Sequence, residues 1–227
     1  MKFKIPIRYG FQNLLIWLLI YLVASPFLQV GSHASLLLTG FISLVFFFAV
    51  WTIQKYQGYF KLSLILLFLT LTLLWLSTLK IISFPPIIYS VISLSYLSIL
   101  VFTFGKFVFT SRVVDSSLIC AALCLYLLIG IIWGIGYETL EIVYPGSFNG
   151  ISTDSSISPA LIRQKFTYFS FITLTTLGYG DITPKSSRAF ALCQTEAIIG
   201  QFFMAVLVAR LVGIQVSQQF SDKKNER

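Results

Sequence analysis

Long apolar runs separated by short polar connections dominate the chain. Runs of about 20 apolar residues are long enough to cross a hydrocarbon core about 30 Å thick. The first run is interrupted late by Pro26, and Pro85-Pro86 break the chain before the fourth. This pattern predicts an all-α membrane protein with six transmembrane helices, at about Phe11–Val30, Leu36–Ile53, Leu62–Ile82, Ile87–Phe109, Leu118–Tyr137 and Ser187–Val216.

A polar segment lies between the fifth and sixth runs, from Glu138 to Gln164. Its acids, serines, glycines and prolines are typical of an external loop. Ser158-Pro159 suits the start of a helix, with serine as the cap and proline in the first turn. The helix up to Thr175 is too short to span, so we expect it to enter the membrane and return. Irregular backbone at membrane depth is tolerated only where protein or a water-filled path surrounds it.

The return from this re-entrant helix contains an unusual string, Thr-Leu-Thr-Thr-Leu-Gly-Tyr-Gly-Asp, at residues 173–181. Glycines at 178 and 180 give the backbone freedom to turn alternate carbonyl groups toward one axis. A row of carbonyl oxygens can replace the water around a cation, as in the Thr-Val-Gly-Tyr-Gly loops of potassium channels. The string resembles such a selectivity filter and differs from it by one methylene at Leu177. The alternative is an ordinary glycine-rich turn between two helices.

Composition and charge agree with a membrane protein. The chain of 227 residues is 57% hydrophobic and only 11% charged, with a mean hydropathy of +0.88, whereas soluble domains have about 25% charged residues. The net charge of +8 is scattered between the runs, so it indicates positive loops on one membrane side rather than a nucleic-acid surface. We therefore expect cytoplasmic termini in a multi-pass protein of the cell membrane. The three cysteines lie within apolar runs, where they are expected to be small hydrophobes rather than metal ligands or a disulfide.

The region from about Tyr126 to Gly213 is similar to the pore module of bacterial one-pore potassium channels of the two-helix class. The resemblance implies passive transport of K⁺ and no catalysis. One loop supplies one oxygen per layer, so a homotetramer is expected. The implied K⁺ ligands are the carbonyls of Thr176, Leu177, Gly178 and Tyr179, together with the Thr176 hydroxyl, in a filter that ends at Gly180. The expected filter supports are Tyr168, Thr175 and Asp181. The sequence departs from the family at two places. Ile172 stands where some members have an acid, and Tyr168-Phe169 stand where many members have paired tryptophans.

The last apolar run contains further candidate residues. Gly200 lies twenty residues after Gly180, where the family has a hinge glycine, and close packing is the alternative. An acid at Glu196 is costly in a membrane helix, and we expect it to bond to the pore helix or the filter surround rather than to sense protons. The cavity-lining residues are expected on one helical face, with subunit packing as the alternative: Gln201, Met204 and Val208. Arg210 is expected near the cytoplasmic end.

The chain is thus divided into a four-span domain (1–112), a pore domain (113–216) and a short cytoplasmic tail (217–227). The fourth run has only Lys106 as a basic residue near its end, and no acid precedes Asp115. Voltage sensors need 3 to 4 gating charges per subunit, so we expect little voltage dependence. The alternatives are a weakly selective cation channel and a non-conducting membrane scaffold or regulatory subunit. The expected partners are potassium ions, the lipid bilayer and further copies of this chain, without nucleic acid.

Overall fold

The protein is mostly helical in a computed structural model that describes residues 10–27, 34–53, 57–79, 85–151 and 159–225. The described helices are α1 (Gly10–Ala24), α2 (Ala34–Ile53), α3 (Gln57–Thr78), α4 (Pro86–Thr110), α5 (Ser116–Val143), α6 (Pro159–Leu174) and α7 (Ser187–Asn225). Two short strands, β1 (Phe148–Asn149) and β2 (Thr183–Pro184), pair antiparallel.

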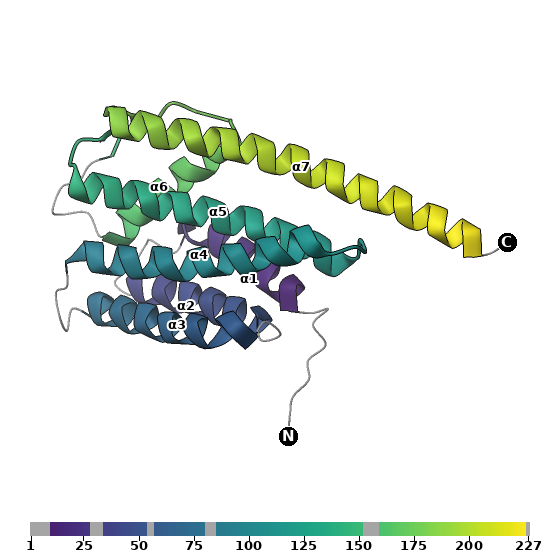
Figure 1. Cartoon of the computed structure of the whole chain (residues 1–227). Coiled ribbons are helices and arrows are strands. Elements are labelled where there is room, and N and C mark those ends of the chain that lie inside the picture. Colours follow the sequence, from purple (N-terminus) through teal and green to yellow (C-terminus); the bar gives the residue numbers. More distant parts are fainter. Residues whose placement is uncertain (1–9, 28–33, 54–56, 80–84, 152–158, 226–227) are drawn as a thin grey trace, which may run out of the picture.

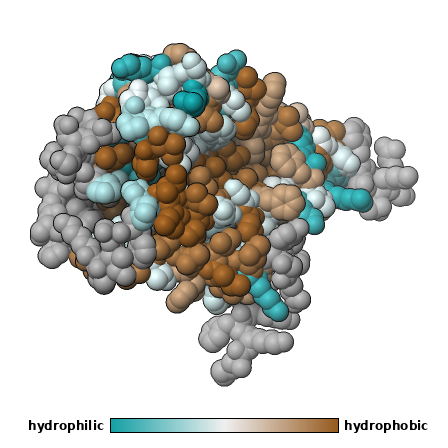
Figure 2. Space-filling view, turned by 60° about the vertical axis from the view of Figure 1, so that its left-hand side comes forward, coloured by the Kyte–Doolittle hydropathy of each residue, from teal (hydrophilic) through white to brown (hydrophobic). Residues whose placement is uncertain are grey.

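Four stretches of the described helices are long and apolar enough to cross a membrane. They are Phe60–Thr78, Pro86–Thr110, Ser116–Val143 and Ser187–Gln219, whereas the apolar helices Gly10–Ala24 and Leu36–Thr52 are shorter. Hydrophobic residues occupy most of the middle of the face shown in Figure 2, and hydrophilic residues gather at its top. The mostly helical fold is therefore confirmed, with four helices able to span a membrane among the described residues.

Some helix boundaries differ from those that the apolar runs predicted. Helix α1 ends at Ala24 rather than near Val30, because Pro26 disfavours helical geometry at the residue before it; residues 28–33 lie outside the described part. Helix α3 begins at Gln57 and ends at Thr78, so Lys61 lies inside a helix and not in a connection. The remaining part of the predicted third run, residues 80–82, is also outside the described part.

Helices α5 and α7 are longer than predicted. Helix α5 continues to Val143, six residues past the predicted end, so Glu138 and Glu141 belong to a helix and not to the external loop. Helix α7 continues to Asn225, so residues 217–225 extend the last helix and do not form a separate tail. Hydrophobicity marked the apolar part of each helix, but hydrogen bonding continues into the polar turns that follow it.

Helix α5 connects two groups of helices. It packs against α1 and α4 on one side and against α6 and α7 on the other, and Figure 1 shows it between them. The large core on its first side contains fully buried side chains from α1, α2, α4 and α5, such as Leu14, Phe46, Leu100 and Leu128. The fully buried Tyr96 of this core is satisfied, because its hydroxyl donates to the Phe46 carbonyl at 2.7 Å.

Helix α7 is the least covered of the long helices. Its C-terminal part extends beyond the other helices in Figure 1. Large apolar side chains are exposed along it: Ile198, Ile199, Phe202, Met204, Val206, Val208, Val212 and Val216. An apolar surface of this extent on one chain is typical of contact with lipid or with another protein surface.

Candidate functional site

Helix α6 lies deep against α5, and two glycines of α5 make this possible. A Cβ atom at Gly134 would lie 2.9 Å from the Cα atom of Thr167, and one at Gly130 would lie 2.6 Å from the Phe171 ring. Both distances are shorter than normal carbon contacts of about 3.5 Å. The two glycines are four residues apart in an apolar helix, which is a known signal for close helix packing in membranes. The sequence analysis missed this signal.

A buried polar cluster joins α5, α6 and α7. The Glu196 carboxylate of α7 is fully buried and accepts hydrogen bonds from the Ser170 hydroxyl of α6, at 2.5 Å, and from the Tyr137 hydroxyl of α5. The Ser170 oxygen also lies 2.7 Å from the Gly130 carbonyl oxygen. The expectation that Glu196 bonds to the pore helix is therefore confirmed. A buried carboxylate with two hydroxyl partners fixes how the three helices lie against one another.

An ion pair holds the beginning of α6. The Arg163 Nε donates to Glu138 Oε2 of α5 at 3.1 Å, and the Arg163 guanidinium lies 4.4 Å from the centroid of the Tyr89 ring of α4. A cation near a helix N-terminus is disfavoured by the helix dipole, and the Glu138 carboxylate offsets that effect. Nothing in the sequence indicated this pairing, because its partners lie on different helices and are 25 residues apart.

The backbone after α6 alternates in handedness. The φ angles of Thr176, Gly178 and Gly180 are +59°, +56° and +80°, and no other non-glycine residue in the described chain has a positive φ. We define the ribbon as residues 175–181. Residues with a positive φ and residues with a negative φ therefore alternate along it from 175 to 180. Glycine adopts the left-handed region without strain, but for a β-branched threonine it is an outlier that costs about 1–2 kcal/mol.

The N–H groups of the ribbon point back to the end of α6. The amides of Leu177 and Gly178 both donate to the Ile172 carbonyl oxygen, at 2.9 and 3.3 Å. The Thr176 amide donates to the Thr173 carbonyl oxygen at 3.0 Å. The Thr175 hydroxyl donates to the Phe171 carbonyl at 2.7 Å. The terminal carbonyls of α6, which a helix leaves without internal partners, thereby anchor the ribbon. Ile172 thus contacts the ribbon through its main-chain carbonyl.

Two side chains contact the ribbon from neighbouring helices. Gln201 Nε2 of α7 donates to the Thr176 hydroxyl oxygen at 3.1 Å. Desolvation, together with the Asp181 carboxylate, raises the pKa of Tyr168 on α6. Tyr168 and Gln201, both predicted from the sequence, thus lie beside the ribbon, and Asp181 is its last residue.

Gly200 lies against the end of α6. A Cβ atom there would be 2.2 Å from the carbonyl oxygen of Leu174, the last residue of α6. The Tyr126 hydroxyl of α5 approaches the same oxygen at 3.4 Å. The structure therefore gives a packing reason for glycine at this position, which was the alternative to a hinge. Helix α7 is continuous through it.

A small framework holds the far end of the ribbon. The Glu141 carboxylate, which is buried, accepts from the amides of Gly146 at 2.7 Å and Phe148 at 3.2 Å. Phe148 and Asn149 form the strand that pairs with Thr183–Pro184, directly after the ribbon. Gly150, with a φ of +83°, has no room for a Cβ atom because the Asp181 carbonyl oxygen would lie 2.1 Å away. The Pro-Gly-Ser-Phe turn at 145–148 thus fixes the direction in which the chain leaves the ribbon.

The comparison with known protein families agrees with this geometry. A family model described as "Ion channel" matches residues 163–216, which include α6 from Arg163, the ribbon and α7 up to Val216. Residues 163–216 are thus similar to an ion channel pore module. No curated protein and no solved structure matches the chain. The match supports passive ion conduction through a multi-pass membrane protein and indicates a protein that is not an enzyme.

One chain leaves one side of this pore module uncovered. The side chains of Leu177 and Tyr179 are 56% and 69% exposed. On α7, Gln201, Met204 and Val208 are exposed as well. All the residues predicted to face the ion path therefore lie on surface that this single chain does not bury.

Proposed function

We propose that the protein is a potassium-selective channel in which four copies of the chain surround one ion path. The alternating ribbon is the observation on which this proposal mainly depends. Positive φ angles at three alternate residues, 176, 178 and 180, with the amides of 177 and 178 bonded to α6, leave the carbonyl groups of the ribbon free for another partner. Potassium channel filters use such free carbonyls in place of the hydration shell.

The K⁺ ligands in this proposal are the carbonyls of Thr176, Leu177, Gly178 and Tyr179. The Thr176 hydroxyl forms the inner end of the row, and Gly180 lets the ribbon leave it. No reaction is catalysed; neighbouring ions repel one another, and flux follows the electrochemical gradient. Strain at Thr176 supports the proposal, since backbone outliers persist where the surroundings impose them and gather at functional sites.

The homotetramer follows from the number of oxygens. One ribbon offers one carbonyl per layer, and a cation that loses its water needs several oxygens at each level. The exposure of Leu177, Tyr179 and the adjacent face of α7 supports assembly around this side, because each would otherwise remain uncovered in the membrane.

The proposed topology has six spans, a re-entrant α6 and cytoplasmic termini. In this arrangement residues 1–112 form a four-span domain, 113–216 form the pore domain, and 217–225 continue the inner helix on the cytoplasmic side. The only basic residue of α4 is Lys106, so the movement of this helix gives at most about 2.3 kcal/mol per 100 mV. The proposed channel therefore depends weakly on voltage. Gly200 remains the candidate hinge of the inner helix, in addition to its packing role.

Flux measurements on purified protein test the function. In liposomes with a potassium gradient, we expect K⁺ efflux that barium blocks and that sodium does not replace. Reversal potentials in mixed potassium and sodium separate a selective pore from a weakly selective cation pore. A protein that passes no potassium under any stimulus would instead be a membrane scaffold. The mass of the detergent-solubilised particle, corrected for detergent, tests the tetramer independently of conduction.

A further inference from the structure

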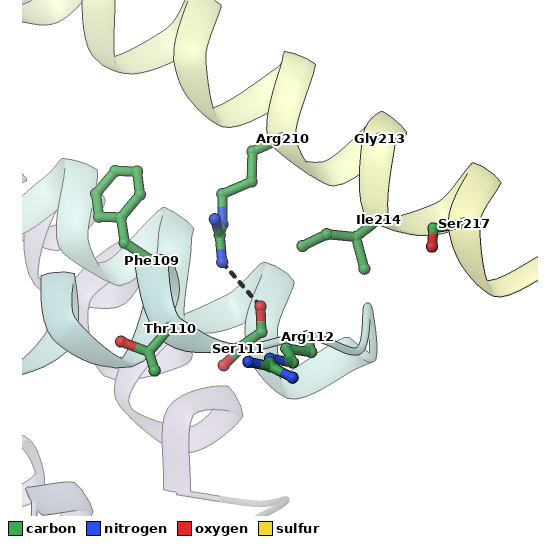
Figure 3. Close-up of a pocket in the computed structure, with 8 residues that line it drawn as sticks. All are labelled: Phe109, Thr110, Ser111, Arg112, Arg210, Gly213, Ile214 and Ser217. Atoms are coloured by element: carbon green, nitrogen blue, oxygen red, sulfur yellow. Dashed lines mark hydrogen bonds between the residues drawn. The ribbon is translucent and has the colours of Figure 1, made fainter.

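A cavity of about 660 Å³ lies where the connection between α4 and α5 meets α7. Figure 3 shows Arg210 pointing from α7 toward this connection, with Arg112 beside Ser111 on the opposite side. Thr110 and Ser217 contribute hydroxyl groups to the wall. The cavity lies beside the C-terminal half of α7, whereas the ribbon precedes the N-terminal end of this helix. The channel function proposed above does not use the cavity.

Both arginines lack a carboxylate partner. Within the described residues the only ion pair is Arg163–Glu138. Arg210 donates one hydrogen bond from Nη2, at 2.8 Å to the Ser111 carbonyl oxygen at the end of α4, and its Nε is buried without a partner in the described chain. Arg112 is exposed. A guanidinium offers five N–H donors, so most donors of this pair remain available.

The nearest acid along the chain is already engaged. Asp115 caps α5, and its carboxylate accepts the Leu118 amide at 2.9 Å. The negative end of the α4 dipole also lies here, and the bond from Arg210 to Ser111 partly satisfies it. The remaining charge of the cavity is positive, and two guanidinium groups suit the bidentate recognition of a phosphate.

The surroundings of the cavity are apolar. Phe109, which lines the cavity, is exposed, and so are three large apolar residues next to the lining residues: Val113, Val212 and Val216. The cavity also lies at the end of α4, a helix of spanning length, which places it where a hydrocarbon core would meet the headgroups. Charged groups at this depth beside exposed apolar side chains favour a molecule that has a phosphate and acyl chains, rather than a soluble phosphate.

We propose that this cavity binds the headgroup of an anionic phospholipid, with Arg112 and Arg210 donating to its phosphate. The headgroup then bridges the connection after α4 and the inner helix α7, and it holds the two together more firmly than the single bond from Arg210 to Ser111 does. Basic pockets between membrane helices are known to bind such headgroups. The consequence for flux depends on the proposed channel function, whereas binding itself does not.

The test uses the full chain purified in a zwitterionic detergent. Dioctanoyl phosphatidylglycerol, dioctanoyl phosphatidylcholine and inorganic phosphate are titrated separately, and binding is measured by calorimetry. The variants are Arg112→Gln, Arg210→Gln and their combination. Lys106→Gln is the matched control, because it removes an exposed positive charge from α4 without changing the cavity lining. A basic residue near a lipid surface contributes about 1 kcal/mol to the binding free energy. We therefore expect each arginine variant to weaken phosphatidylglycerol binding about fivefold.

The outcomes separate the alternatives. Binding of phosphatidylglycerol that weakens in the arginine variants and persists in Lys106→Gln supports the proposal. Equal binding of phosphatidylcholine, or an equal loss in Lys106→Gln, overturns it. Inorganic phosphate that binds as tightly, with the same dependence on the arginines, makes the cavity a soluble-anion site and overturns the lipid assignment. If Arg210→Gln does not fold, Arg112→Gln decides alone, since Arg112 is exposed. In liposomes we further expect phosphatidylglycerol to change K⁺ flux in the wild type and not in Arg112→Gln; a protein without flux leaves the binding result valid.

Discussion

Replacement of Gly134 by alanine tests whether α5 and α6 are held together as closely as the structure indicates. The added Cβ atom would lie 2.9 Å from the Cα atom of Thr167 and 3.2 Å from its nitrogen. These are backbone atoms, so no side-chain rotation relieves the contact. Normal carbon contacts of about 3.5–4.0 Å require the two helices to separate by roughly 0.6–1 Å.

The expected magnitude follows from a comparison with Gly136→Ala on the same helix. A Cβ atom at Gly136 meets nothing within 4 Å. Both substitutions gain the same helix propensity, about 1 kcal/mol, so the difference between the variants isolates the contact. Overpacking typically costs 1–3 kcal/mol. At about 2–4 °C per kcal/mol for a chain of this size, we expect Gly134→Ala to melt roughly 2–12 °C below Gly136→Ala.

The assay is thermal unfolding of both purified variants in the same detergent. Potassium flux is measured in parallel, because a displaced α6 moves the ribbon that follows it. Equal melting temperatures for the two variants would show that α6 does not pack on Gly134, and the account of the pore helix given above would then be wrong.

Three further predictions concern the site and its gating. Glu196→Ala removes the acceptor of the buried Tyr137 hydroxyl, at about 1–3 kcal/mol, whereas the Ser170 hydroxyl can turn to the Gly130 carbonyl; we expect a lower melting temperature than the wild type and a smaller loss in Glu196→Gln, and equal melting of Glu196→Ala and Glu196→Gln would argue against the cluster. Gly200→Ala places a Cβ atom 2.2 Å from the Leu174 carbonyl oxygen, so both stability and ion selectivity should fall; reduced opening with unchanged stability and selectivity would indicate a hinge without a packing role. Gly178→Ala forces alanine to a φ of +56°, at about 1–2 kcal/mol, and we expect the loss of selective K⁺ flux; reversal potentials equal to those of the wild type would refute the proposed ligand positions.

The sequence predicted the parts of the fold that depend on local chemistry. Pro159 begins α6 as expected of proline in a first turn, and the positive φ angles at Gly178 and Gly180 are those that glycine favours. Thr176 adopts the same geometry without glycine, and no local rule indicates it. Its conformation instead depends on the bonds that join this part of the ribbon to α6 and to Gln201.

Contacts between distant segments were predicted only in part. The burial of Glu196 with a partner on α6 followed from the cost of a membrane acid, but its second partner, Tyr137 of α5, did not. Arg210 was expected near the cytoplasmic end of its helix, but its bond to the end of α4 was not predicted. Such partners depend on which helices lie side by side, and hydrophobicity does not determine that when every helix is apolar.

Helix α5 connects the first four helices to residues 163–216. One side of α5 shares the large core with α1, α2 and α4. On its other side, Tyr137 is hydrogen-bonded to α7 and Glu138 to α6, and Gly130 and Gly134 let α6 pack closely. At the opposite end of α7, Arg210 joins the inner helix to α4 directly. The first four helices are therefore joined to residues 163–216 at two places, through α5 and through the bond between Arg210 and Ser111. For the channel and the lipid site proposed above, the single basic residue of α4 argues for a ligand at the second place, rather than voltage, as the stimulus.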